Sequence, residues 1–386
     1  MPTRRAMLQA VGASLAVHAM PAGAGPAPDA TTPSPAPKRP RIAMITPNSE
    51  GNTFWPQVFG IMEHAAQTLG FEFTTHSLGV DDRYARQRQT LQIIGDTPRP
   101  DAVIVNVVVG QSKPIMEAAE AAGVPVFVMG SIFPSELPAI GQSPRLRYPH
   151  WAGSFESSEE EKGYVLAKAL IQEAARRQAV ASDKLIHVVG LGGDTTWFGS
   201  GQREAGLVRA VAEHPGAVLK QVVPTRWTQR EGRWLAGKLL KRYPQASVVW
   251  AASDQLGAGA VQAIEDAGRH AGSDVFTGGQ DMSDLGLRLV QDGRFVATAA
   301  SSMLCIGQMA TMVYDHACGI DFAAETGAEV LFPIQVATRA TAEQHLRFTR
   351  CVYAIDFRAF SKVHNPALKQ YDFSQEAFRR AARACT

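Results

Sequence analysis

Short apolar runs alternate with helix-patterned stretches twice along this chain, first over residues 41–131 and again over residues 184–302. A compact apolar run is typical of a buried parallel strand, and a helix commonly connects two such strands. Two successive blocks of this pattern predict an α/β protein with two doubly wound parallel-sheet lobes. The cleft that such a pair of lobes leaves between them is a common place for a small molecule to bind.

The same pattern places individual elements. The expected strands are residues 42–45, 71–74, 101–108 and 124–129 in the first block, and residues 185–189, 219–223, 248–252, 275–277 and 295–299 in the second. A helix should end at Gly123, because glycine favours the backbone conformation that closes a helix. Ser158 and Glu161 have the spacing of a capping box and predict the start of a long helix. We expect the charges at that start to form a solvated face rather than a site.

Length and charge limit the class of protein. The 386 residues exceed the usual size of one domain, and 45% of them are hydrophobic, enough for two cores. The expected lobes are residues 41–152 with about 302–331, and residues 153–301 with about 332–386, which include a C-terminal extension. The formal net charge is only +2, from 38 basic and 36 acidic residues, so no basic footprint for nucleic acid is present.

The N-terminus has the pattern of an export signal. Arg4 and Arg5 precede a mildly apolar stretch that ends near Met20, and small residues follow at 22–24. We therefore expect residues 1–24 to be a cleaved signal peptide that leads to the periplasm, either of the twin-arginine type or an ordinary secretory signal with a chance arginine pair. Residues 25–40 are rich in Pro, Ala, Ser and Thr and predict a tether.

The chain has four cysteines, and export permits disulfides. Cys305 and Cys318 are 13 residues apart on one expected helix, or about 20 Å at the rise of an α-helix, so they cannot bond to each other. Cys351 and Cys385 could form a bridge that ties down the C-terminal segment. The alternative is that both remain unpaired.

No sequence motif indicates a nucleophile, a metal site or a phosphate loop. A glycine-rich segment at residues 190–193 follows an expected strand, but Thr195 occupies the third glycine position of a dinucleotide fingerprint. We interpret this segment as a tight loop at a strand end. The ten histidines lack the spacing of metal ligands, so we predict no catalytic residue, no metal and no cofactor.

Aromatic, amide and carboxylate side chains gather instead where the expected strands end. They are Asn52, Phe54, Trp55, Asn106, Trp197, Phe198, Trp227, Asp254, Gln280, Asp281 and Ser301. Such strand ends face one crevice in a doubly wound sheet. Aromatic faces pack against the apolar surface of a sugar-like ring, and amides and carboxylates bond to its hydroxyls. The set therefore predicts binding of a small polyhydroxylated molecule.

Four motifs occur in the order found in one known family. They lie at residues 41–55, 101–106, 251–258 and 278–293. Together they resemble the type I periplasmic sugar-binding proteins, which include ribose-binding and galactose-binding proteins and the periplasmic autoinducer-2 receptor. The resemblance covers most of residues 41–337.

The resemblance implies a mechanism of capture by closure. The lobes would close over a neutral sugar-like ligand about chain crossings near residues 151–155, 301–303 and 331–333. The permease of an ABC transporter would then recognise the closed form, or a membrane receptor kinase if the chain is a sensor component. We expect a monomer. The lack of a reactive constellation disfavours an enzyme, and a signal in place of a DNA-binding helix pair disfavours a gene regulator.

The resemblance also assigns roles by position. The matching contacts are Asn52, Phe54, Trp55 and Asn106 from the first lobe, and Trp227, Asp254, Asp281 and Ser301 from the second. Each has a structural alternative: the aromatic pair could open a helix and pack inward, Asn106 could satisfy loop backbone, and Asp254 could cap the following helix. Trp227 could likewise be a packed residue near a helix start, and Trp197 with Phe198 could be packing residues as readily as contacts.

The chain departs from the family pattern at several positions. Gly130 and Ser131 replace an Asp-Arg pair, Gly201 replaces a binding arginine, and Gln280 replaces an aromatic residue. The expected pocket thus loses two cations and a carboxylate, which disfavours ribose itself. Arg203 could be a substitute cation or a solvated residue in the first turns of a helix. Beyond residue 338, the extension either packs on a lobe or recognises a partner.

Overall fold

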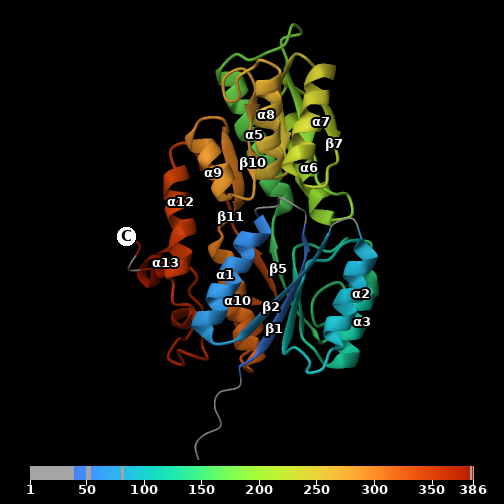
Figure 1. Ribbon diagram of the computed structural model, residues 1–386, viewed down its shortest axis with the longest axis vertical. Helices are drawn as coiled ribbons and strands as arrows, with labels where there is room; N and C mark the ends of the chain where they lie inside the picture. Colours follow the sequence, from blue (N-terminus) through green and yellow to red (C-terminus); the bar gives the residue numbers. More distant parts are fainter. Residues whose placement is uncertain (1–38, 49–53, 80–81, 383–384, 386) are drawn as a thin grey trace, which may run out of the picture. The chain divides into compact units, whose positions relative to one another are not determined.

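The computed structural model describes residues 39–48, 54–79, 82–382 and 385 (Figure 1). The predicted signal peptide, nearly all of the tether and Asn52 lie outside these residues. The described part forms two α/β lobes built on sheets that are parallel except for the strand at residues 334–338, so the predicted fold class is confirmed. Within it, no helix is both long and apolar enough to cross a membrane.

Among the described residues, six parallel strands form the sheet of the first lobe, in the order β12-β5-β4-β3-β1-β2. Their bounds are β1 Arg41–Asn48, β2 Glu72–Gly79, β3 Ala102–Val105, β4 Val126–Met129, β5 Trp151–Ser157 and β12 Glu329–Phe332. Side chains alternate between the two faces of β1: Ile42 lies in one core cluster and Ala43 in the other. Both faces are therefore covered, as apolar strands of this kind require.

Helices cover the two faces of this sheet. They are α1 Phe54–Leu69 and α10 Leu304–Ala317 on one face, and α2 Arg83–Ile94 and α3 Ser112–Ala122 on the other, with the short α4 Leu137–Ile140 and α11 Ala323–Thr326 beside them. Gly123 follows α3 with a φ of 66°, which confirms the predicted helix end. Cys305 and Cys318 lie at the two ends of α10.

The second lobe contains the sheets β7-β6-β8-β9 and β10-β11-β13. Its strands are β6 Ile186–Leu191, β7 Ala217–Val223, β8 Ala246–Ala251, β9 Phe276–Thr277, β10 Gly279–Gln280, β11 Ala297–Ser301 and β13 Ile334–Thr338. Its helices are α5 Glu159–Arg176, α6 Phe198–Ala212, α7 Gln229–Arg242, α8 Asp254–Asp266 and α9 Asp284–Gln291. The Ser158 side chain accepts from the Glu161 amide at 3.2 Å, so the predicted cap of α5 is confirmed.

The chain passes between the lobes after β5, between β11 and α10, and between β12 and β13. The second and third of these positions agree with the expected crossings. The first lies later than the predicted 151–155, because residues 151–155 pair with β4 and residues 154–157 pair with β12 inside the first sheet. Trp151 and Phe155 are both buried there, so this segment is a core strand and the crossing follows it.

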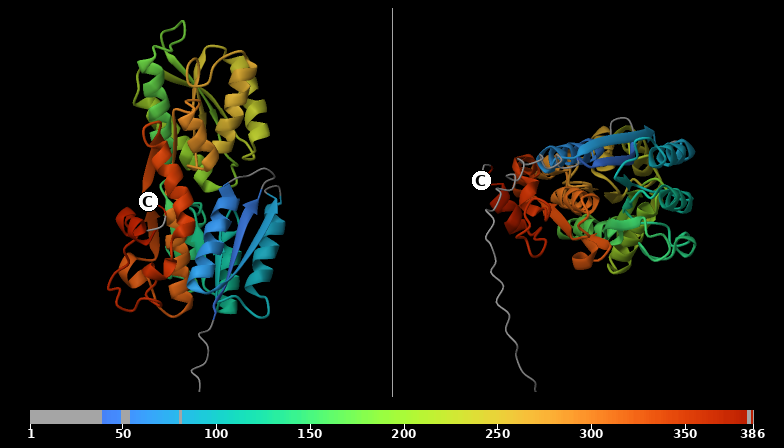
Figure 2. Two further views of the ribbon diagram at one scale, coloured as in Figure 1. Left: turned by 60° about the vertical axis from the view of Figure 1, so that its left-hand side comes forward. Right: turned by 90° about the horizontal axis from the view of Figure 1, so that it is seen from below.

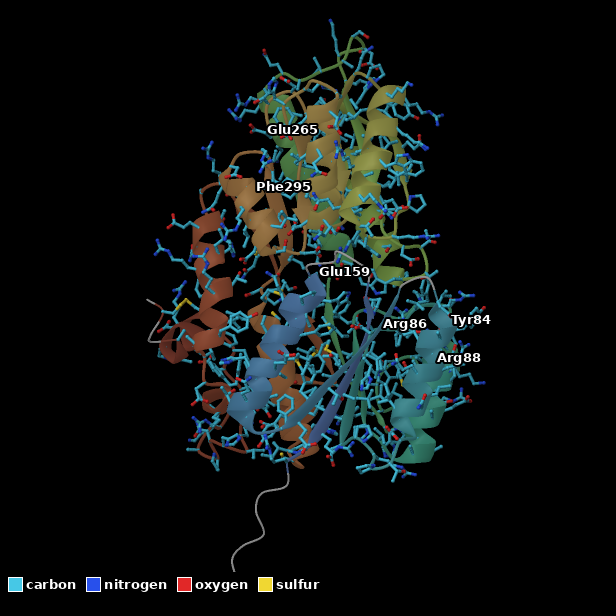
Figure 3. The ribbon with its side chains drawn as sticks, in the orientation of Figure 1. Tyr84, Arg86, Arg88, Glu159, Glu265 and Phe295 are labelled. Atoms are coloured by element: carbon cyan, nitrogen blue, oxygen red, sulfur yellow. A yellow bond between two sulfur atoms is a disulfide. The ribbon has the colours of Figure 1, made fainter. Side chains whose placement is uncertain are left out.

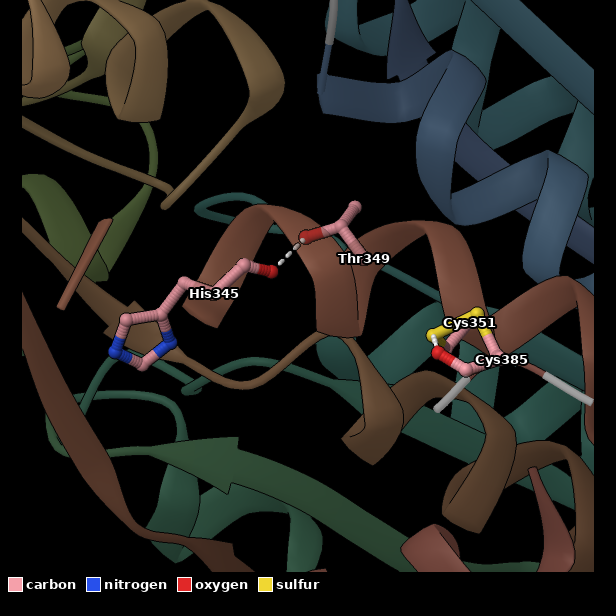
Figure 4. The surroundings of a disulfide bond; sticks show 4 residues. All are labelled: His345, Thr349, Cys351 and Cys385. Atoms are coloured by element: carbon pink, nitrogen blue, oxygen red, sulfur yellow. Dashed lines mark hydrogen bonds between the residues drawn. A yellow bond between two sulfur atoms is a disulfide. The ribbon is translucent and has the colours of Figure 1, made fainter. Parts of the chain in front are cut away.

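The C-terminal extension divides between the lobes, whereas we expected all of residues 332–386 to join the second. In α12 Ala342–Cys351, the residue Leu346 shares a core with the second lobe. The following elements η1 Val352–Ala354, η2 Phe357–Phe360 and α13 Gln375–Ala381 belong to the core of α1 and α10. Figure 2 shows this red segment running beside both lobes. A disulfide joins Cys351 to Cys385 (Figure 4).

Packing against α10 explains this division. A Cβ added at Gly307 would lie 2.1 Å from the Phe357 ring, so the glycine leaves the space that the ring fills. The buried Asp315 carboxylate accepts from the Ser361 hydroxyl at 2.5 Å and from the Tyr371 hydroxyl at 2.8 Å. These contacts fix the extension to the first lobe.

Candidate functional site

A cavity of about 180 Å³ lies between the lobes, at the C-terminal ends of their strands. Residues of both lobes line it. They include Phe54, Trp55, Arg86, Asn106 and Gly130 from the first lobe, and Glu159, Lys162, Asp194, Trp197, Arg203, Trp227 and Asp281 from the second, with Ser301 at a crossing. This is the position at which parallel α/β sheets commonly bind ligands.

Seven of the predicted contacts line this cavity. They are Phe54, Trp55, Asn106, Trp197, Trp227, Asp281 and Ser301. Asn106 also donates from Nδ2 to the Met129 carbonyl at 2.9 Å, so it satisfies backbone at the end of β4 while it lines the cavity. Gly130 has a φ of 98°, and a Cβ there would approach the Asn106 amide to 3.3 Å. Gly130 stands where the family pattern has an aspartate, and the lack of a side chain there leaves room for the Asn106 amide.

Phe198, Asp254 and Gln280 are predicted contacts that do not line the cavity. The Phe198 ring lies 5.2 Å from the Phe133 ring, and the buried Gln280 amide donates to the Ala251 carbonyl at 3.3 Å. These side chains support the walls of the site instead of facing its interior.

Asp254 has a structural role and does not line the cavity. Its fully buried carboxylate accepts from the Thr298 hydroxyl at 2.6 Å, and from the hydroxyl and amide of Ser283 at 2.7 and 2.8 Å. The N-cap of α8 is Ser253, one residue before the position that the capping alternative assigned. The carboxylate therefore holds together the loop after β10 and the strand β11.

Two tryptophans and an arginine form the wall contributed by the second lobe. The rings of Trp197 and Trp227 meet edge to face with centroids 6.0 Å apart. The Arg203 guanidinium carbon lies 5.2 Å and 5.6 Å from these two rings, within the range of cation–π attraction. Aromatic surface and a cation thus meet on one side of the cavity.

The end of β6 and the loop that follows it, residues 190–193, make room for this wall. A Cβ added at Gly193 would lie 2.1 Å from the Trp227 indole, so a larger residue would displace the ring. Trp227 itself has a φ of 68°, a left-handed conformation that is strained for an aromatic residue. Thr225 supports that conformation, because its hydroxyl accepts from the Trp227 amide and donates to the Gly192 carbonyl. The tight-loop interpretation holds for residues 192–193, whereas residues 190–191 belong to β6, and the role of Gly193 was not foreseen.

A buried group of three charges lies at the edge of the cavity. Glu159 accepts from Lys162 Nζ at 2.9 and 3.0 Å and from Arg203 Nε at 2.5 Å. Burial acts to raise the pKa of Glu159, but the charges of Arg203 and Lys162 outweigh it and lower the pKa to about 2. Burial also lowers the pKa of Lys162, and the Glu159 charge opposes that shift.

This group corrects two expectations. The charges at the start of α5 are not all a solvated face: Glu160 and Glu161 pair with Arg209 at the surface, but the Glu159 side chain is only 6% exposed. Arg203 is buried instead of solvated. A sequence signal existed in Gly163 and Gly206, because a Cβ at either would lie 2.0 Å from the backbone of the facing helix. These glycines let α5 and α6 approach closely enough for their charges to meet.

Asp281 joins the charges of the cavity. Its Oδ1 lies 3.9 Å from Arg203 Nη1, and its φ of 140° is a second strained conformation beside the ligand space. Burial and the nearby Asp254 carboxylate raise the pKa of Asp281 to about 7, although Arg203 and Lys162 oppose the shift. This carboxylate thus changes protonation state near neutral pH.

Trp197 and Ser301 each bring a buried polar atom to the lining of the cavity. Trp197 Nε1 and Ser301 Oγ are buried, and neither makes a hydrogen bond to any of the described residues. Buried polar groups in folded proteins are nearly always bonded to protein, water or a ligand. A donor and a hydroxyl are therefore available to a polar molecule in the cavity.

Comparison with known proteins places the chain in a family. The sequence matches the periplasmic binding protein domain over residues 42–320. It is 28% identical over 151 residues to the ribose import binding protein RbsB of Salmonella typhimurium, and 29% identical over 136 residues to that of Escherichia coli K12. These matches cover 39% and 35% of this chain and 49% and 44% of the relatives, so the chain spans about half the length of the curated relatives it matches.

Solved structures share the fold. A periplasmic sugar-binding protein from Pseudomonas fluorescens has a TM-score of 0.76 and 26% identity, over 87% of this chain and 98% of that chain. An ABC transporter solute-binding protein from Actinobacillus succinogenes with bound D-allose has a TM-score of 0.66 and 20% identity, over 79% and 100%. With most of its length matched by the domain and its fold shared with these structures, the chain belongs to the periplasmic binding protein family and has the type I form of the sugar-binding members.

Proposed function

We propose that this protein is a periplasmic solute-binding protein that captures a small polyhydroxylated, sugar-like ligand and delivers it to an ABC transporter. The observation that carries the proposal is the convergence of aromatic rings and polar side chains from both lobes on one cavity. Phe54 and Trp55 approach from the first lobe, and Trp197 and Trp227 from the second. Such rings pack against the apolar face of a sugar, and the polar groups bond to its hydroxyls.

The relatives support this choice of ligand class. Those matched in sequence are named ribose import binding proteins, and the structure from Actinobacillus succinogenes holds D-allose. Another structure, an ABC transporter solute-binding protein from Bacillus halodurans, holds myo-inositol. These compounds are compact and carry several hydroxyls. The role we propose for this chain is binding without chemical conversion, so a bound ligand should be recovered unchanged.

Closure of the lobes is the proposed mechanism. A ligand that contacts both lobes at once is bound more tightly when they are close together, and it therefore favours the closed arrangement. The chain crossings after β5, before α10 and between β12 and β13 would act as hinges. A permease would recognise the closed form.

The test is ligand binding with paired tryptophan variants. Titration calorimetry of the exported protein against pentoses, hexoses and polyols should identify a ligand, which should also raise the melting temperature. Trp227→Ala should weaken its binding by at least about tenfold, because the stacking wall is lost. Trp234→Ala is the control, since that side chain is 57% exposed on α7.

Two results would contradict the proposal. One is the absence of binding by every compound in the panel. The other is an equal loss in the Trp227 and Trp234 variants, which would place the ligand away from the cavity.

A further inference from the structure

Arg86 is a buried cation of the cavity that the sequence did not single out. It lies on α2 near the end that approaches the second lobe, and it is 4% exposed (Figure 3). Its Nε makes no hydrogen bond to any of the described residues, and its guanidinium forms no ion pair with them. The residue lines the same cavity as the aromatic walls.

The other cations of the cavity have partners. Lys162 and Arg203 share the carboxylate of Glu159, and Arg203 also donates from Nη1 to the Ala252 carbonyl. Arg86 differs from them because it is buried and forms no ion pair with the residues that the structure describes. Removing a guanidinium from water without a compensating anion is costly, so a site of this kind favours an anionic partner.

The local field around Arg86 agrees with this interpretation. Burial lowers the pKa of Arg86 to about 10, and the negative charge of Asp194 opposes that shift. The group therefore still carries its charge near neutral pH. Asp194 acts on Arg86 through its charge, and its carboxylate accepts from the Thr196 amide at 2.8 Å.

Two further carboxylates of the cavity, Glu156 and Glu159, have other partners. Glu156 accepts from the Ser131 hydroxyl at 2.9 Å, and burial raises its pKa. Glu159 is held by Lys162 and Arg203. The positive charge of Arg86 thus has no carboxylate in contact with it among the residues that the structure describes.

We propose that the ligand is a sugar acid, a polyhydroxylated molecule whose carboxylate binds the Arg86 guanidinium while its ring or chain lies against the tryptophans. This inference rests on the proposed function and names the substrate class of the same cavity. A guanidinium offers a planar fork of donors that matches a carboxylate in two parallel hydrogen bonds. The polar walls described above then serve the hydroxyls.

Matched pairs of an acid and its neutral parent test the inference. Titration calorimetry near neutral pH would compare D-glucuronate with D-glucose, D-galacturonate with D-galactose, and D-gluconate with D-sorbitol. In at least one pair the acid should bind at least about tenfold more tightly than its neutral partner, because a charge-assisted bidentate contact typically strengthens binding by about this factor. Added salt should weaken the acid more than the neutral compound.

The variants use two arginines of one helix. Arg86→Gln should abolish the preference for the acid, whereas Arg88→Gln, at a side chain that is 71% exposed, should retain it. Arg86→Lys keeps the charge but not the fork, so it should retain only part of the preference. If Arg86→Gln does not fold, the lysine variant and the wild-type pairs still decide the question.

The outcomes separate the two proposals. Neutral compounds that bind as tightly as their acids in every pair would overturn the sugar-acid inference and leave sugar capture standing. A preference that survives in Arg86→Gln would overturn the assignment to this residue. Binding of neither acids nor neutral compounds would overturn the proposed function as well.

Discussion

Replacing Glu159 with glutamine leaves the buried charges of Lys162 and Arg203 without their shared carboxylate. Removing one partner of a buried ion pair typically destabilises a protein by about 3–5 kcal/mol, because the remaining charge is uncompensated. The lowered pKa gives a similar figure: a fall from the ordinary 4.5 to about 2 corresponds to about 3 kcal/mol. We therefore expect the free energy of unfolding to fall by about 3 kcal/mol in Glu159→Gln.

The sign of the pH dependence follows from the direction of the shift. The folded-state pKa of Glu159 lies below its unfolded value, so this stabilisation is complete above about pH 4.5 and is lost as the pH falls towards 2. Urea denaturation of wild type and variant at several pH values measures both effects. The two curves should converge at acid pH, where the wild-type carboxylate is protonated as well.

Glu160 supplies a control from the same turn of α5. Its side chain is 44% exposed and pairs with Arg209, and exposed pairs contribute about 0–1 kcal/mol. Glu160→Gln should therefore leave stability nearly unchanged. Equal losses in the two variants, or no loss in Glu159→Gln, would refute the argument that burial makes this carboxylate indispensable.

Two further predictions concern the cavity and the extension. The raised pKa of Asp281 means that folding favours its neutral form. The contribution of Asp281 to the free energy of unfolding should therefore decline as the pH rises from about 4 to 7. Asp281→Asn should remove that part of the pH dependence in denaturation curves. The disulfide closes a loop with a sequence separation of 34. The double variant Cys351→Ala/Cys385→Ala should therefore lose about 3–4 kcal/mol of unfolding free energy, measured by urea denaturation. An unchanged midpoint would show that packing alone holds the extension.

Strands rich in Val and Ile were predictable, because a strand whose two faces are both buried has apolar residues at nearly every position. The strand β3, all of whose residues are buried, is an example. The strand β5 was missed because its sequence contains Gly153 and two serines and lacks β-branched aliphatic residues. Its place in the sheet comes from Trp151 and Phe155, whose burial depends on helices distant in the sequence.

The charged part of the site was much harder to predict. Glu159 and Arg203 are 44 residues apart, and only the close packing of α5 and α6 brings them together. Arg86 and Arg88 occupy the same helix in a similar local sequence, and nothing in their spacing says which one is buried. The aromatic and amide contacts were easier, since the ends of parallel strands predict where such side chains lie. Charge pairs between elements require the tertiary structure.

In the proposed closure, the C-terminal extension would limit how far the lobes can separate. Leu346 is anchored in one core and Val352 in the other, so a rotation between the lobes must be absorbed by the few backbone torsions that separate these residues. A wider rotation would pull an apolar anchor into water, at a cost of about 1.5–3 kcal/mol for each large side chain. If the lobes move as proposed, the angle between them would thus be restrained by residues that do not line the cavity.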